Sequence, residues 1–343
     1  MIQADSESLR NPALRLYLTV NVDYLMETLI INRNDIAAWV DIDALKGELK
    51  EGFINYSNGS SRRDGKRIVL DIKNGNTATV LGPGTSAGIP AYSMKANSKF
   101  PNENIPIKGV IALFDIENGN LLALLDSSLI TAIRTGLCAA MATDVLANPL
   151  AQRLSIIGAG KQNLLQLKYL LNLRRFEKVV IFDVNPSRAE AFKNTFQETI
   201  QCEIAESLAE CVSDAEVILM ATWSKTPILN LSMISKGCHI TSLGSDEKGK
   251  VEVSKDLVLN AKFYCDDIDL NMMMGTPGNL DLRVDCICAE IGEVFSDSKL
   301  MESNVKETTI YSSVGLPFQD LITAWHVYKK ALDSENVTRI KMN

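Results

Sequence analysis

The sequence contains few imidazoles and no CxxC pair of thiols. Its 343 residues include two histidines, His239 and His326, and seven cysteines. An odd number of cysteines, most of them within apolar runs, is typical of buried free thiols in a reducing compartment. We therefore expect a cytoplasmic protein. Neither histidine lies near the CxC of Cys286 and Cys288, so we expect no metal site.

Basic charge and long apolar runs are also scarce. The chain carries 35 Lys and Arg against 42 Asp and Glu, a formal net charge of −7 at pH 7. Nucleic-acid binders need clustered basic side chains for phosphate contacts, so we expect no nucleic-acid partner. The amino terminus lacks the basic and apolar regions of a secretory signal. No apolar run approaches the roughly 20 residues that span a bilayer, so we expect no membrane partner.

Strand-like runs dominate the first third of the chain. A short apolar strand at residues 29–31 precedes a helix that begins near Asp43, and RIVLDI, TATVLGPG, AYSMKAN and GVIALFDIENGNLLALLD follow. The last run predicts a hairpin because Asn118 and Gly119 tolerate the positive φ angles of a tight turn. We expect an antiparallel sheet that binds no dinucleotide.

The pattern changes at Asp126, where Ser127 or Ser128 is expected to cap an apolar helix that runs to about residue 146. Downstream, the runs RLSII, KVVIFD, EVILMAT, HITSLG and KFYCD alternate with helical or turn segments. Such alternation predicts a parallel sheet covered on both faces. A strand, TTIYSSVGL, and an amphipathic helix over about 318–332 complete the chain.

A dinucleotide fingerprint follows the strand RLSII and opens a Leu-rich helix. Its first glycine permits a tight turn, its second lets the backbone approach a pyrophosphate, and the helix start offers unpaired N–H groups to that anion. Asn163 departs from the Gly or Ala that usually allows close packing of helix and strand. The expected cofactor-binding residues of this turn are Gly158, Ala159, Gly160, Lys161 and Gln162.

An acidic residue ends the next strand, KVVIFD. Asp183 is placed to accept hydrogen bonds from the ribose hydroxyls, and its charge would repel a 2′-phosphate. This favours NAD over NADP, although Arg188 five residues later moderates the preference. The alternative is a glycine-rich turn that binds no nucleotide, with Asp183 as a solvated strand end.

The apolar helix carries a single charge, Arg134. A buried guanidinium is costly unless an anion pairs with it. One reading is an internal salt bridge with Asp115 or Asp126. The other is a substrate carboxylate, whose geometry the planar guanidinium matches.

Three further charged residues are candidates for the same site. Lys95 lies in AYSMKAN and Arg67 opens RIVLDI, and for both the alternative is a solvated surface position. Asp246 follows the strand HITSLG, at the edge of a parallel sheet where ligands bind, and is placed to exchange a proton with a substrate amine. Its alternative role is to cap the following helix.

Taken together, these segments resemble the ornithine cyclodeaminase/mu-crystallin family over nearly the whole chain beyond residue 28. The most specific are YSMKAN, GVIALFDIENGNLLALLDSSLITAIRTG, IIGAGKQN, LGSDEKGKVEV and SSVGLPFQDL. The resemblance implies an α/β protein with two domains that forms a homodimer. Residues 1–126 and 316–343 would bind substrate and dimerise, and residues 127–315 would form the Rossmann-like dinucleotide domain, with 127–150 as a connecting helix.

The resemblance also implies roles for individual residues. Arg67, Lys95 and Arg134 would hold the α-carboxylate of a small amino or imino acid, with Lys95 and Asp246 as the catalytic groups. Lys250 and Glu252 match the family's GK-x-E pattern after Asp246. Val314 and Gly315 would lie against the nicotinamide of the cofactor, and Thr222 would also bind the cofactor.

The family is chemically divided, and three readings stay open. The first is a cyclodeaminase, and the second an NAD-dependent amino-acid dehydrogenase or cyclic imine reductase. The third is a mu-crystallin-like binder of NAD(P) and a ligand without turnover, and Asp246 argues against it because such proteins lack this carboxylate. Cyclodeaminases carry a glutamate at a position that we align with Val80.

Overall fold

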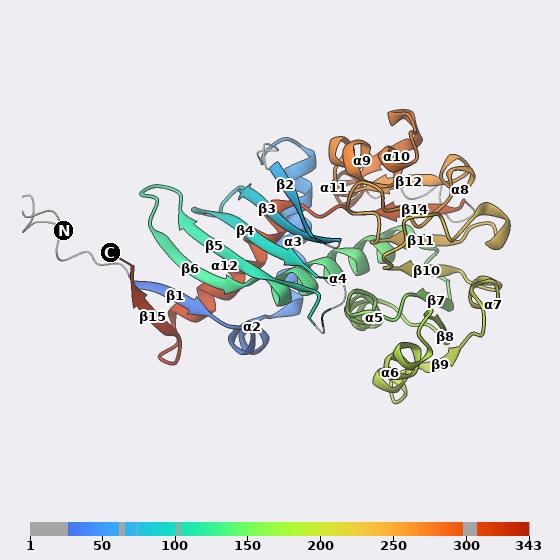
Figure 1. The fold of residues 1–343 in the computed structure, drawn as a ribbon, viewed down its shortest axis with the longest axis horizontal. Coiled ribbons are helices and arrows are strands. Elements are labelled where there is room, and N and C mark those ends of the chain that lie inside the picture. The colour runs from blue at the N-terminus through green and yellow to red at the C-terminus, as the bar shows by residue number, and fades with distance from the viewer. Residues whose placement is uncertain are drawn as a thin grey trace, which may run out of the picture.

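The computed structural model describes residues 27–61, 66–73, 75–100, 103, 105–297 and 307–342. They form two sheets that lie side by side, with one long helix between them (Figure 1). The first sheet has the strand order β15-β1-β6-β5-β4-β3-β2 and the second β13-β12-β14-β11-β10-β7-β8-β9.

The first sheet is mostly antiparallel, as predicted, but β1 pairs with β6 in parallel and a carboxyl-terminal strand closes the edge. The predicted hairpin joins β5 to β6, and Gly119 in its turn has a φ of 75°. The sequence reading missed β15 and a short helix, α2 (Arg33–Trp39). The strands are β1 (Glu27–Ile31), β2 (Lys66–Lys73), β3 (Asn76–Gly84), β4 (Ala91–Lys99), β5 (Ile107–Asp115), β6 (Leu121–Asp126) and β15 (Thr338–Lys341).

The register of this sheet decides which side chains share a face. Arg67, Leu81 and Lys95 are cross-strand partners on β2, β3 and β4, so they form one row. Two residues further along, Thr79 on β3 pairs with Asn97 on β4 and extends the same face. Helices α3 (Ile42–Ser57) and α12 (Pro317–Leu332) pack together, and α12 lies against β3 and β4.

The second sheet is parallel throughout its described strands, as the alternating pattern predicted. Both faces are buried: on β10, Val217 and Leu219 join one core cluster, whereas Ile218 and Met220 join the other. The strands are β7 (Arg153–Ile157), β8 (Lys178–Phe182), β9 (Gln201–Ile204), β10 (Val217–Met220), β11 (His239–Ser242), β12 (Lys262–Cys265), β13 (Ile287–Glu290) and β14 (Thr309–Ser312).

Short helices connect these strands and cover the sheet (Figure 1). The first, α5, carries the glycine-rich turn at its start and packs along α4. They are α5 (Lys161–Leu173), α6 (Pro186–Phe196), α7 (Leu208–Val212), α8 (Lys255–Leu259), α9 (Ile268–Met274), α10 (Thr276–Asn279) and α11 (Ile291–Ser296).

Helix α4 (Ser127–Leu146) runs between the two sheets (Figure 1). The predicted serine caps are wrong: Asp126 is the N-cap, and its carboxylate accepts a hydrogen bond of 2.8 Å from the N–H of Leu129. By length and composition alone α4 could cross a membrane, contrary to our expectation that no such run exists, but 72% of its most apolar window is buried. It packs against α5, β5, α12 and β11, so it is a core helix.

Candidate functional site

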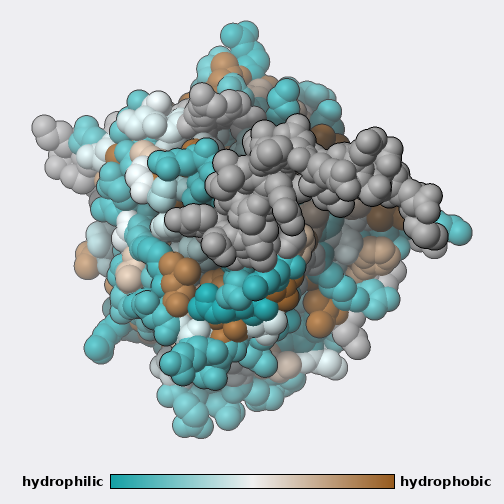
Figure 2. Space-filling view, turned by 90° about the vertical axis from the view of Figure 1, so that its left-hand side faces the viewer, coloured by the Kyte–Doolittle hydropathy of each residue, from teal (hydrophilic) through white to brown (hydrophobic). Residues whose placement is uncertain are grey.

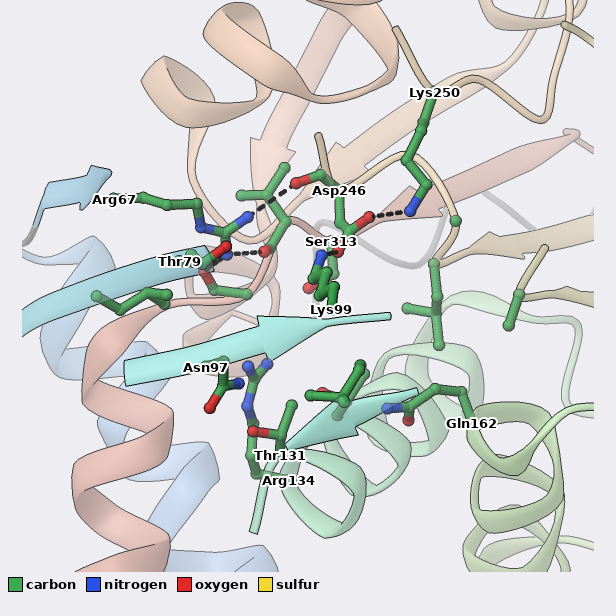
Figure 3. Close-up of a pocket in the computed structure, with 18 of the residues that line it drawn as sticks. Arg67, Thr79, Asn97, Lys99, Thr131, Arg134, Gln162, Asp246, Lys250 and Ser313 are labelled. Atoms are coloured by element: carbon green, nitrogen blue, oxygen red, sulfur yellow. Dashed lines mark hydrogen bonds and ion pairs between the residues drawn. The ribbon is translucent and has the colours of Figure 1, made fainter. Parts of the chain in front are cut away.

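A cavity of about 150 Å³ lies between the inner face of the first sheet and the carboxyl ends of strands in the second. Residues from strands of the first sheet, from loops that follow strands of the second sheet, and from α4 and α5 line it (Figure 3). The structure brings these predicted site residues to its wall: Arg67, Lys95, Arg134, Gln162, Thr222, Asp246, Val314 and Gly315.

Two of the predicted cations share one carboxylate. Lys95 on β4 and Arg134 on α4 are 3% and 5% exposed, and both pair with Asp320 in the first turn of α12, at 2.5 Å and 3.1 Å. Gln319 accepts a second hydrogen bond from Arg134, at 2.8 Å. The internal salt bridge that we considered for Arg134 therefore exists, and its partner is Asp320.

The prediction that Asp115 or Asp126 pairs with Arg134 is wrong, because both carboxylates already accept hydrogen bonds from nearby backbone N–H groups. Asp126 caps α4, and Asp115 accepts hydrogen bonds from the backbone of the β5–β6 turn. Each is held by backbone N–H groups within three residues of itself, a competing use that is common for aspartate. A partner 186 residues away had to come from tertiary packing.

One carboxylate between two cations leaves positive charge in a buried place. Burial lowers the pKa of Lys95 to about 7, although Asp320 opposes this shift, and the neighbouring Arg134 lowers the pKa further. Burial also opposes ionisation of Asp320, but Arg134 and Lys95 together lower its pKa. The group of Lys95, Arg134 and Asp320, here called the cationic cradle, therefore suits a small anion such as a carboxylate.

Arg67 joins the two halves of the site rather than pairing with an acid. Its guanidinium donates to the carbonyl oxygens of Asp246 at 2.8 Å, Val314 at 2.6 Å and Gly315 at 3.2 Å (Figure 3). All three acceptors belong to loops that follow strands of the second sheet. Arg67 therefore fixes the distance between β2 and those loops, and no carboxylate in the described part of the chain pairs with it.

Asp246 lies opposite the cradle, in the loop after β11. Its carboxylate pairs with Lys99 of β4 at 3.0 Å and with Lys250 at 2.7 Å. Burial raises the pKa of Asp246, but Lys99, Lys250 and Arg67 outweigh that effect and hold the pKa well below its ordinary value. Asp246 is thus a fixed anion at neutral pH in this state of the protein.

Glu252, which the sequence pattern linked to Asp246, does not enter the cavity. It is fully buried and accepts from the N–H of Thr222 at 2.6 Å, the hydroxyl of Ser242 at 2.7 Å and the N–H of Gly244 at 2.8 Å. These contacts tie the end of β10 to the end of β11. Glu252 thus positions the loop that carries Asp246.

The glycine-rich turn has the geometry that a pyrophosphate requires. Gly158 has a φ of 89°, and a Cβ there would lie 2.9 Å from the carbonyl oxygen of Ala221. Gly160 is the N-cap of α5, makes no side-chain cap, and has open space where a Cβ would be. The first N–H groups of α5 therefore face a groove without a side-chain acceptor, as anion-binding helix starts do.

The departure at Asn163 has a structural explanation. Its buried amide donates to the carbonyl oxygens of Ile157 at 3.0 Å and Gly158 at 2.8 Å. The side chain thus pins the start of α5 to the end of β7, which replaces the close packing that a small residue would allow.

The groove beside this turn is lined by Ala159, Gly160, Lys161 and Gln162, as predicted for a dinucleotide. Asp183 accepts backbone hydrogen bonds from Ala159 and Asn185, both at 2.8 Å, and so fixes the turn. Each carboxylate oxygen keeps a further lone pair for a ribose hydroxyl. Arg188 and Arg33 also line the groove, and Arg33, from the first half of the chain, was missed by the sequence reading.

A buried acid that the sequence analysis missed holds the loop that was expected to contact the nicotinamide. Asp266 accepts from the hydroxyl of Ser313 at 2.7 Å and from the N–H groups of Val314 at 3.2 Å and Gly315 at 2.7 Å. Gly315 has a φ of 81°, and a Cβ there would lie 2.7 Å from Nη1 of Arg134. This loop therefore packs directly against the cationic cradle.

Gly160→Ala tests the cofactor groove. The added methyl group meets no atom within 4 Å, so the Tm should stay within about 2 °C of the parent value. Because the backbone must approach the pyrophosphate closely, the Kd for NAD should rise about tenfold or more, as measured by calorimetry. Gly47→Ala, an equally open position on α3, should leave the Kd unchanged. An unaltered Kd in Gly160→Ala would move the pyrophosphate elsewhere.

Comparisons with known proteins agree with this geometry. A sequence model of the ornithine cyclodeaminase/mu-crystallin family matches residues 26–335. The Delta(1)-pyrroline-2-carboxylate reductase of Bacillus thuringiensis subsp. konkukian (strain 97-27) is 28% identical over 318 residues, which cover 89% of this chain and 94% of that relative.

Two solved structures share the fold over almost the full length. An archaeal alanine dehydrogenase dimer with bound NAD has a TM-score of 0.84 at 25% identity, covering 93% of this chain and 100% of the other. The Thermococcus litoralis Delta(1)-pyrroline-2-carboxylate reductase in complex with NADH and L-proline has a TM-score of 0.83 at 25% identity, covering 91% and 100%. The predicted fold class is confirmed, and the chain belongs to the ornithine cyclodeaminase/mu-crystallin family.

Proposed function

We propose that this protein is an NAD-dependent oxidoreductase that interconverts a small 2-imino acid and the corresponding amino acid by hydride transfer at the α-carbon. The observation that carries the proposal is one cavity with two opposed walls. The cationic cradle forms one wall and the ionised Asp246 the other, and Gln162 links the cavity to the groove of the glycine-rich turn. The relatives named above act on such acids or bind NAD or NADH.

The residues fit NAD at both ends. The open start of α5 would receive the pyrophosphate and Asp183 the ribose, while Thr222, Val314 and Gly315 line the cavity where the reactive ring would lie. When bound, the reduced cofactor supplies a hydride. The carboxylate of Asp183 favours NAD over its 2′-phosphorylated form.

The remaining chemistry falls to side chains of this chain. Arg134 and Lys95 hold the substrate carboxylate and so orient the adjacent carbon–nitrogen double bond. Asp246, kept ionised by its lysines, faces that nitrogen and stabilises the positive charge of a protonated imine. Burial lowers the pKa of Lys95 to about 7, so its ammonium, the form that holds the substrate carboxylate, is lost as the pH rises through neutrality.

Cyclodeamination of a diamino acid fits the pocket less well. The sequence alignment placed the missing glutamate at Val80, but Val80 lies on the outer face of the sheet and is 43% exposed. The residues of β3 that face the cavity are Thr79 and Leu81. Neither is acidic, so nothing on this strand would neutralise a distal ammonium group.

We further propose a homodimer that forms through the outer face of the first sheet. This face carries exposed apolar side chains on four neighbouring strands, and such a patch is typical of a protein interface. Figure 2 views the end of the molecule that carries β1 and β15, where apolar residues, drawn in brown, interrupt a hydrophilic surface. On the outer face of β2, β3, β4 and β5, the exposed apolar residues are Ile68, Leu70, Ile72, Val80, Met94 and Val110.

NADH oxidation, followed by absorbance, tests the proposed reaction. Pyrroline-2-carboxylate, piperideine-2-carboxylate and mixtures of 2-oxo acids with ammonium should include a substrate. Asp246→Asn should lower kcat by about 100-fold or more, because the anion facing the imine is lost, while the Kd for NADH stays near the parent value. Ammonia release from ornithine or lysine without net NAD reduction would indicate a cyclodeaminase instead.

The pH profile tests Lys95. Its pKa is lowered to about 7, so the ammonium is present below that pH and is lost as the pH rises through it. In the free enzyme, kcat/KM for imine reduction should therefore fall above about pH 7. Lys95→Arg, whose charge persists at any accessible pH, should be slower but should lack this decline. A decline that survives in Lys95→Arg would belong to the substrate and would contradict the assignment.

Sedimentation velocity tests the homodimer. Leu70→Glu places a charge within the outer-face patch and should convert the dimer to a monomer at micromolar concentration. Leu150→Glu, at an apolar residue that is 81% exposed and lies outside the sheet, should leave the dimer intact. A dimer that persists in Leu70→Glu would place the interface elsewhere.

A further inference from the structure

The wall of the cavity beyond the cradle is polar. Along β4, Lys95, Asn97 and Lys99 alternate on the inner face, and all three line the cavity. Thr79 on β3 lies opposite Asn97. Figure 3 shows Thr79, Asn97 and Lys99 around the same opening as Asp246. An apolar substrate side chain would leave these groups without partners.

Several hydrogen-bond donors on this wall are unused. The hydroxyl of Thr79 is buried, with the residue 4% exposed, and has no partner. Asn97 accepts a hydrogen bond from the hydroxyl of Ser127 through Oδ1, and its amide nitrogen has no acceptor among the described residues. Lys99 pairs with Asp246 and Glu247, which leaves one of its three N–H groups. All three residues line the cavity, and each keeps a donor for a ligand bound there.

The charges of the site also favour an acidic ligand. Five basic side chains, those of Arg67, Lys95, Lys99, Arg134 and Lys250, line the cavity with one carboxylate, Asp246. Asp320 and Glu247 pair with three of these cations. The described residues of the site therefore retain an excess of positive charge. A protonated imine with a single carboxylate is neutral overall and leaves that excess unchanged. A second carboxylate reduces it, whereas an amine side chain would increase it.

We propose that the substrate is a 2-imino dicarboxylic acid of four or five carbons, or the corresponding amino acid, whose distal carboxylate is bound by Lys99, Asn97 and Thr79. The inference rests on the proposed function and adds the identity of the side chain. Thr79 and Asn97 lie two residues beyond the Leu81–Lys95 pair, about 7 Å along the strands. This spacing suits the two carboxylates of such an acid, one at the cradle and one at this wall.

The test compares imines that differ in the distal group. NADH oxidation is measured with ammonium and oxaloacetate or 2-oxoglutarate, and with ammonium and the matching monoacids pyruvate or 2-oxobutyrate. Pyrroline-2-carboxylate serves as a cyclic monoacid. We expect kcat/KM for at least one diacid to exceed that of every monoacid by about tenfold or more, because hydrogen bonds to a charged group are the stronger kind.

Two matched variants test whether Thr79 contributes to the preference for a diacid over a monoacid. Thr79→Val removes the hydroxyl while preserving the shape and should lower the diacid-to-monoacid ratio of kcat/KM about tenfold, mainly through KM. Thr77→Val removes another buried, unpaired hydroxyl from the same strand, at a position that does not line the cavity, and should leave the ratio unchanged.

The possible failures are distinguishable. If a monoacid or the cyclic imine is the better substrate, or if Thr79→Val leaves the ratio unchanged, the inference is overturned and the proposed function stands. If no imine of either class is reduced although NADH binds, the proposed function itself fails.

Discussion

The sharing of Asp320 between Lys95 and Arg134 is the interaction on which the rest of the site depends. Two cations could not remain buried side by side without an anion. Each would lose its hydration on burial, and the two charges would also repel each other. A second carboxylate would have neutralised both of them and closed the site to ligands. One carboxylate from α12 keeps the cations in place and leaves a charge that an incoming acid can satisfy.

On the opposite wall of the cavity the charges are reversed, because a carboxylate faces the ligand and cations hold it. Asp246 faces the cradle, and two lysines surround it, so it remains ionised where burial alone would favour its neutral form. A fixed anion opposite a cationic cradle suits a substrate that is itself a dipole, with a carboxylate at one end and a protonated nitrogen at the other. Arg67 holds the two walls at a constant separation through three carbonyl oxygens.

Local patterns in the sequence predicted what is local in the structure. The alternating strands, the glycine turn, the hairpin at Gly119 and the buried helix around Arg134 each depend on neighbouring residues. The edge strands β9 and β13 were missed because each contains a glutamate and lacks the continuous apolar run of the inner strands. The partner of Arg134 was missed because ion pairs between distant segments leave no local pattern. An acid within the apolar run QDLITAW was nevertheless a signal, since a charge on a buried helix face requires a partner.

The segment from Ser313 to Asp320 links the proposed cofactor site to the proposed substrate site. Its first residues are bound by Asp266 and line the cavity where we propose that the nicotinamide binds, Gly315 packs on the guanidinium of Arg134, and Asp320 completes the cradle. A shift of this segment would therefore move the hydride donor and the carboxylate anchor together. Hydride transfer requires the two reacting carbons to be held in near contact, and a single short segment that contacts both ligands meets this requirement better than two separate loops.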